Sequence, residues 1–164
     1  MAMAEMGVHW ASLPSEDRIW ERTQNWYDDR RLSIAYNSKD PLATRTQYGG
    51  VAIMAINTIS HKVCKCGYDK SGLGRWTWMK IQGKHNTFTR IVSAYRPIKS
   101  NISGATKQYT VYAQHLRANG KDPLQAFWTD LRAQIQEWVQ QGDNLVVCGD
   151  WNQPITHTDI KGFS

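Results

Sequence analysis

The sequence predicts one α/β domain, because short apolar segments typical of strands accompany a long segment with helical periodicity. The chain has 164 residues, which is the size of one domain or of a piece of a larger one. Hydrophobic residues make up 41% of it and charged residues 21%, a composition typical of globular rather than disordered proteins. We therefore expect a packed core within a single domain that spans residues 1–164.

The most regular element that we expect is a helix over residues 122–141. Asp122 offers a side chain for the N-cap, and Pro123 occupies the first helical position. Gly142 follows the last periodic residue and is a typical helix stop. The apolar residues that recur at intervals of three and four are Leu124, Phe127, Trp128, Leu131, Ile135, Trp138 and Val139.

Other segments have the patterns of strands or of a shorter helix. Residues 32–36 alternate at period two, and residues 49–56 are apolar on both faces, which predicts a buried central strand. Residues 75–95 predict a hairpin that turns at residues 83–86. Before these strands, aromatic residues near helical spacing predict an amphipathic helix from Ser15 to about Asp29.

The segment Leu145–Asn152 follows the long helix directly and is a short apolar run that stops at Gly149. We expect a buried strand here, with Asp150 and Asn152 at the sheet edge where α/β proteins usually bind their ligands. Aspartate and asparagine are also ordinary turn formers after a strand, so this segment alone leaves both interpretations open.

Charge and cysteine content narrow the possible partners. The formal net charge is +6, from 20 Lys and Arg against 14 Asp and Glu, which favours a polyanionic partner such as nucleic acid, although many basic domains bind nothing acidic. The sequence has no bilayer-length apolar segment and no signal peptide pattern, so we expect an intracellular protein without a membrane partner. Cys64 and Cys66 lack the second cysteine pair of a typical zinc site, and their role stays open.

Short motifs at expected strand ends resemble those of the endonuclease/exonuclease/phosphatase superfamily, which has the deoxyribonuclease I-like fold. The motifs are Ala4-Glu5, Tyr95-Arg96-Pro97 and Gly149-Asp150-Trp151-Asn152. Residues 49–53 and 74–78 also resemble central strands of its retroelement-type members. The resemblance covers nearly the whole chain and implies a two-sheet α/β sandwich with helices on its outer faces.

The resemblance also implies a chemistry, the metal-dependent hydrolysis of a phosphodiester by an endonuclease that cleaves DNA. Glu5 would bind Mg²⁺ or Mn²⁺, and Asp150 would orient or deprotonate the attacking water. Asn152 would donate to the phosphate or hold Asp150, Tyr95 would donate to the developing oxyanion, and Arg96 would contact a phosphate. On residue type alone, Glu5 could be a solvated terminal residue and Tyr95 an aromatic that packs in the sheet.

This chain also departs from the superfamily pattern. The glutamate motif is Ala-Glu where the superfamily has Gln-Glu, and the asparagine expected on an earlier strand and the C-terminal Ser-Asp-His strand do not occur. We therefore expect a domain truncated at both ends, incomplete at the C-terminus, with little or no activity on its own. A noncatalytic nucleic-acid-binding remnant of a retroelement and a phosphatase of the same fold are the alternatives. The sequence predicts no oligomeric state.

Overall fold

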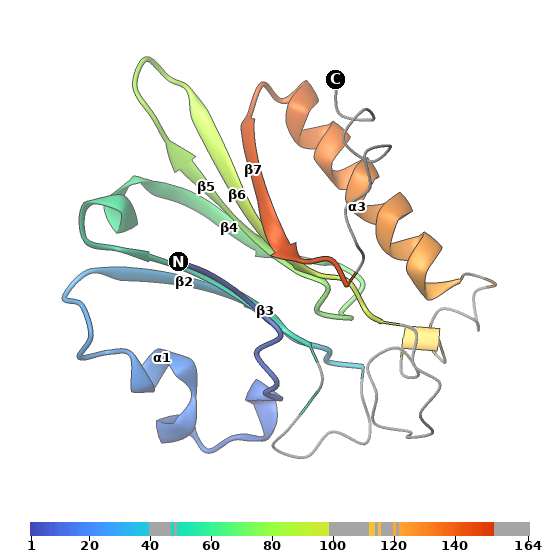
Figure 1. The fold of residues 1–164 in the computed structure, drawn as a ribbon. Helices are drawn as coiled ribbons and strands as arrows, with labels where there is room; N and C mark the ends of the chain where they lie inside the picture. The colour runs from blue at the N-terminus through green and yellow to red at the C-terminus, as the bar shows by residue number, and fades with distance from the viewer. Residues whose placement is uncertain are drawn as a thin grey trace.

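The computed structural model describes residues 1–39, 47, 49–98, 112, 113, 115, 120 and 122–152. It has a mixed α/β fold with a three-stranded sheet of order β1-β3-β2 and a four-stranded sheet of order β4-β5-β6-β7. The two sheets pack face to face, and the helix α3 lies along the outer side of the larger sheet (Figure 1). The prediction of an α/β fold is confirmed at this level.

The smaller sheet consists of β1 (Ala2–Ala4), β2 (Arg30–Ala35) and β3 (Val51–Ile56). Both β1 and β2 pair with β3 in antiparallel register, so β3 is the central strand. Every residue from Val51 to Ala55 is buried, which confirms the buried central strand predicted from its two apolar faces. The expected strand at residues 32–36 corresponds to β2.

The larger sheet consists of β4 (Val63–Tyr68), β5 (Trp76–Gln82), β6 (Phe88–Tyr95) and β7 (Asn144–Asp150). The first three strands pair in antiparallel fashion, so the predicted hairpin is confirmed as β5 and β6. In contrast, β7 joins β6 in parallel, after the chain has passed through α3. A parallel neighbour places the carboxyl ends of β6 and β7 at the same edge of the sheet.

The predicted long helix is confirmed as α3 (Pro123–Gln140). Oδ2 of Asp122 accepts hydrogen bonds from the backbone N–H groups of Leu124 and Gln125, both at 3.0 Å, which satisfies two otherwise unpaired donors of the first turn. Gly142 follows with a φ of +78°, the conformation that ends many helices. None of the helices among the described residues is long and apolar enough to cross a membrane. The core between α3 and the sheet contains Trp76, Val92, Ala94, Phe127, Leu131 and Trp138.

The amphipathic helix expected from Ser15 to Asp29 is wrong. The structure has a 3-10 turn at Ser15–Asp17 and the four-residue helix α1 (Ile19–Arg22). The hydroxyl of Thr23 donates to the carbonyl of Ile19 at 2.7 Å, a local contact that competes with helix continuation. Trp26 is 60% exposed, so the helical spacing of the aromatic residues did not correspond to a buried helix face.

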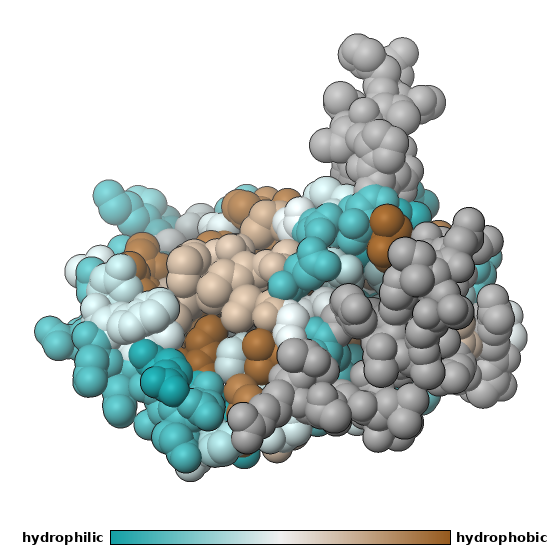
Figure 2. All heavy atoms as spheres, turned by 60° about the horizontal axis from the view of Figure 1, so that its bottom comes forward, coloured by the Kyte–Doolittle hydropathy of each residue, from teal (hydrophilic) through white to brown (hydrophobic). Residues whose placement is uncertain are grey.

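The face at the bottom of Figure 1 carries these short turns, and Figure 2 shows hydrophobic side chains near its centre, bordered by hydrophilic ones.

The expectation that residues 145–152 form a buried strand needs a correction. Leu145 and Val147 pack against the core beneath α3, but Val146 on the opposite face is 52% exposed. The reason is position, because β7 is the last strand of its sheet and pairs only with β6 among the described residues. The apolar run therefore marks an edge strand with one covered face.

Candidate functional site

The carboxyl ends of strands from both sheets meet at one end of the molecule. Tyr95 is the last residue of β6 and Asp150 the last of β7, and the two are register partners. Glu5 follows β1 of the other sheet. The hydroxyl of Ser93 donates to the carbonyl of Met3 at 2.9 Å, so a direct hydrogen bond joins the two sheets beside this point. The packing of the sheets thus brings Glu5 next to the ends of β6 and β7.

Glu5 has an unusual backbone conformation and faces Tyr95. The hydroxyl of Tyr95 donates to Oε1 of Glu5 at 3.4 Å, and Glu5 itself is exposed. Its φ is +54°, which costs a residue other than glycine about 1 to 3 kcal/mol. The next residue, Met6, is held by a hydrogen bond from its N–H to the carbonyl of Gly50 at 3.1 Å. The fold therefore retains a strained backbone that presents a carboxylate at this end of the sheets.

Asp150 and Asn152 form a tight turn against the strand end of β6. The backbone N–H of Asn152 donates to Oδ1 of Asp150 at 3.0 Å. The side-chain amide of Asn152 donates to the carbonyl of Arg96 at 2.8 Å, and the N–H of Arg96 donates to the carbonyl of Asp150 at 2.9 Å. These contacts orient the carboxylate of Asp150. Asp150 therefore forms the turn and also contributes a carboxylate to the candidate site.

The phenol of Tyr95 is held in its protonated form. The pKa of Tyr95 is raised to about 12, mainly by burial and next by the carboxylate of Glu5. Asp150 acts in the same direction, whereas a hydrogen bond from Asn152 acts against it. Only 4% of Tyr95 is exposed, which agrees with burial as the main cause, and the protonated hydroxyl is a hydrogen-bond donor at neutral pH.

Arg96 supports the same turn with its side chain. Its Nη1 donates to the carbonyls of Trp151 and Asn152, both at 3.2 Å. Burial lowers the pKa of Arg96, against the opposing charge of Asp122, and its Nε is buried without a hydrogen-bond partner among the described residues. The guanidinium therefore positions the turn and retains an unpaired donor.

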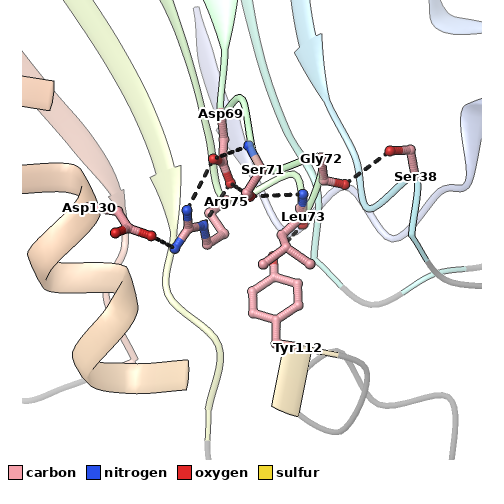
Figure 3. Close-up of polar contacts among 8 residues, drawn as sticks. All are labelled: Ser38, Asp69, Ser71, Gly72, Leu73, Arg75, Tyr112 and Asp130. Carbon is pink, nitrogen blue, oxygen red and sulfur yellow. Dashed lines mark hydrogen bonds and ion pairs between the residues drawn. The ribbon is translucent and has the colours of Figure 1, made fainter. Parts of the chain in front are cut away.

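A buried ion-pair network behind Tyr95 is a feature that the sequence did not predict (Figure 3). Arg75 donates from Nε and Nη2 to Asp69 at 2.6 and 3.1 Å, and from Nη1 to Asp130 of α3 at 2.9 Å. The carbonyl of Arg75 accepts from the N–H of Tyr95 at 2.8 Å. Burial opposes ionisation of Asp69, but Arg75 and a hydrogen bond from Ser71 outweigh it and hold its pKa below the usual range. The network thus connects α3 to the strand end that carries Tyr95.

The loop in front of this network is tied to two other parts of the chain. The hydroxyl of Tyr112 donates to the carbonyl of Leu73 at 2.6 Å, and the hydroxyl of Ser38 donates to the carbonyl of Gly72 at 3.1 Å (Figure 3). Gly74 has a φ of +70°, and a Cβ there would lie 2.2 Å from a backbone carbon of Tyr36. Gly74 has no Cβ, so the loop can approach the backbone of Tyr36 closely. Glycine at this position is the feature of the sequence that indicates the close approach.

Among the residues that the structure describes, Glu5 and Asp150 carry carboxylates at this end that could hold a divalent cation. No group of three or more His, Cys, Asp or Glu side chains suited to a metal occurs among the described residues, and Cys64 and Cys66 gain no third ligand there. Mg²⁺ commonly binds through one or two carboxylates and takes its remaining ligands from water and substrate phosphate. The hard oxygen donors of Glu5 and Asp150 fit a cation of this kind.

Comparisons with protein-family models and with curated proteins found no match to this sequence. The interpretation of this end of the molecule therefore rests on its residues and their geometry.

Proposed function

We propose that this chain carries the site of a divalent-metal-dependent phosphodiesterase, an endonuclease that acts on DNA, built on a deoxyribonuclease I-like fold. The observation that carries the proposal is the convergence of Glu5, Tyr95, Asp150 and Asn152 from both sheets at one end of the molecule. These residues are the ones whose motifs resemble the superfamily. Phosphodiester hydrolysis needs such a set of carboxylates and fixed donors.

Each residue has a role that follows from its surroundings. Glu5 would hold Mg²⁺, which when bound would neutralise charge on the phosphate oxygens, and Asp150 would stay available as a base. Asp150 accepts the proton of the water that attacks phosphorus, and the turn contact from Asn152 keeps its carboxylate oriented. Tyr95 would donate to the phosphate oxygen that gains negative charge, its single hydroxyl proton turning to that oxygen from Glu5 when substrate is bound.

The net charge of +6 supports a polyanionic substrate. The same charge also favours the second candidate, a nucleic-acid-binding protein without catalysis. Binding by charge alone weakens steeply with salt and needs no divalent cation, whereas cleavage by the proposed site requires one. Metal dependence therefore separates the two candidates.

The test is the nicking of supercoiled plasmid DNA by excess protein in Mg²⁺, in Mn²⁺ and in a chelator. It is run with this chain and with the chain joined to any coding sequence that flanks it. We expect metal-dependent nicking by the extended chain and little or none by residues 1–164 alone. Salt-sensitive binding of DNA without nicking in either form would contradict the proposal and favour the noncatalytic candidate. Hydrolysis of a small phosphomonoester without action on DNA would favour a phosphatase.

A further inference from the structure

We propose that Trp128, supported by Trp151 and Arg96, is a stacking platform for an unpaired base of single-stranded DNA. The platform would hold the nucleotide next to the phosphate that the candidate site cleaves, so the inference deepens the proposed function and rests on it. It names the substrate class as DNA with an unpaired base beside the scissile phosphate.

The indole of Trp128 is both exposed and fixed in orientation. It lies on α3 with 40% of the residue exposed. The ring of Trp151 stacks against it, with centroids 5.7 Å apart and planes 17° apart. Phe127 contacts both indoles edge-on, at 5.2 Å from Trp128 and 6.5 Å from Trp151. A side chain that is already ordered loses little further conformational entropy when a base stacks on it.

The platform adjoins the candidate site through the chain itself. Trp151 lies between Asp150 and Asn152, so the ring that supports Trp128 belongs to the turn that orients the carboxylate. Arg96 spans the two features, because its Nη1 donates to the carbonyls of Trp151 and Asn152 and its guanidinium carbon lies 5.9 Å from the ring centroid of Trp128. A base on Trp128 would therefore belong to a nucleotide near the candidate site.

A positive charge also lies over the ring of Trp128. The guanidinium carbon of Arg96 lies 5.9 Å from the ring centroid of Trp128, and its buried Nε has no hydrogen-bond partner among the described residues. An aromatic face next to a cation is the combination with which proteins bind single-stranded nucleic acid. The ring accepts the base, and the positive charge of the arginine attracts the adjoining phosphate.

The geometry favours an unpaired base over a paired one. A base inside a duplex is stacked on both sides, so it must leave the duplex before it can lie on a protein ring. Single strands and unpaired segments present such bases at much lower cost. We therefore expect single-stranded DNA to bind this chain more tightly than a duplex of equal length at equal salt.

The experiment measures the fluorescence anisotropy of a labelled single-stranded oligonucleotide in a chelator, where no metal-dependent cleavage occurs. Trp128→Ala should weaken binding about tenfold, which is the loss typical of one stacked base. Trp128→Phe should retain most of the affinity, because phenylalanine keeps an aromatic face. The matched control is Trp26→Ala, which removes another exposed indole and should bind like the wild type.

A second arm replaces the oligonucleotide with an abasic strand of the same length. The phosphates remain and the bases are gone, so the affinities of wild type and Trp128→Ala should become equal. Unchanged binding of the intact strand by Trp128→Ala would overturn the proposal. An equal loss of affinity for both strands would overturn it as well, because the effect would then not depend on the base. Since binding in the chelator needs no catalysis, absence of nicking contradicts only the proposed function.

Discussion

The hydroxyl of Tyr95 donates to Oε1 of Glu5 at 3.4 Å, and the two residues are 90 positions apart in the sequence. Glu5 follows a strand of the smaller sheet, whereas Tyr95 ends a strand of the larger one. The contact therefore exists only when the two sheets pack against each other. It places a carboxylate beside a protonated phenol at the strand ends.

Removal of the Tyr95 hydroxyl should impair cleavage far more than folding. Tyr95→Phe should slow nicking on the order of 100-fold, the usual cost of losing one preorganised donor to an oxyanion. The free energy of unfolding should fall by only about 1 kcal/mol, because one hydrogen bond is lost. Single-turnover nicking and urea denaturation measure the two effects, with Tyr27→Phe at an exposed position as the control. A nicking rate equal to that of the wild type would exclude this role for Tyr95.

The phenol of Tyr95 should titrate at strongly alkaline pH. Its pKa in the folded protein is about 12 and the ordinary value is 10.0, so between these values the unfolded chain loses a proton that the folded chain keeps. The contribution of Tyr95 to stability is thus fully present below pH 10 and declines as pH rises toward 12. A difference absorbance titration of the wild type against Tyr95→Phe measures this midpoint. A midpoint near the ordinary value would contradict the burial of the phenol beside Glu5.

The Arg75 network should be essential for stability. Asp69→Asn removes one partner of a buried pair and should destabilise the fold by about 3 kcal/mol. Asp17→Asn, at the exposed pair with Arg22, is the matched control and should cost less than about 1 kcal/mol. Urea denaturation gives both values. Equal effects of the two substitutions would mean that the network does not stabilise the fold.

The same network predicts an acid limb in the stability of the protein. The pKa of Asp69 lies below its ordinary value of 3.8 in the folded state. The stabilisation that the ionised Asp69 gives to the folded protein is therefore present above pH 3.8 and declines as pH falls below it. Stability measured by denaturation across this range should therefore fall more steeply for the wild type than for Asp69→Asn. Parallel curves for the two proteins would contradict the ion pair as the cause.

Gly149 should be intolerant of any side chain. A Cβ at this position would lie 2.0 Å from the carbonyl oxygen of Ala94, the register partner of Gly149 on β6. Gly149→Ala should therefore separate the strands next to Asp150, destabilise the fold by about 3 kcal/mol and impair nicking. Gly142→Ala is the control, since its φ is +78° but nothing lies within 4 Å of the added carbon, and it should cost about 1 kcal/mol. Equal unfolding free energies of Gly149→Ala and Gly142→Ala would contradict this account, because they would show that β6 and β7 can separate without an additional loss of stability.

Local patterns in the sequence were enough to predict the long helix, the hairpin and the central strand. In α3 the cap at Asp122, the periodic apolar residues and Gly142 all agree. Two strands gave no such pattern, because β1 has only three residues and β4 mixes cysteine, lysine and glycine. The helix expected from Ser15 to Asp29 was wrong because aromatic spacing alone did not correspond to a buried face.

Contacts between distant segments could not be predicted from the sequence in the same way. The motifs identified Glu5, Tyr95 and Asp150 one at a time, but their proximity depends on packing between the two sheets. Arg75 and Asp130 are 55 positions apart and lie in no shared motif. The exposure of β7 likewise depends on its place at the sheet edge, which an apolar run does not reveal.

The most direct test of the proposed site is the rate of plasmid nicking in Mg²⁺ by the wild type and by Asp150→Asn, both joined to the flanking coding sequence and measured side by side under single-turnover conditions. Asparagine keeps the size of the side chain and still offers an oxygen to the N–H of Asn152, but it cannot accept the proton of the attacking water. The control is Asp28→Asn, an exposed carboxylate on the segment between α1 and β2. We predict metal-dependent nicking that Asp28→Asn retains and Asp150→Asn loses. Nicking by Asp150→Asn at the wild-type rate would contradict the assignment of this site.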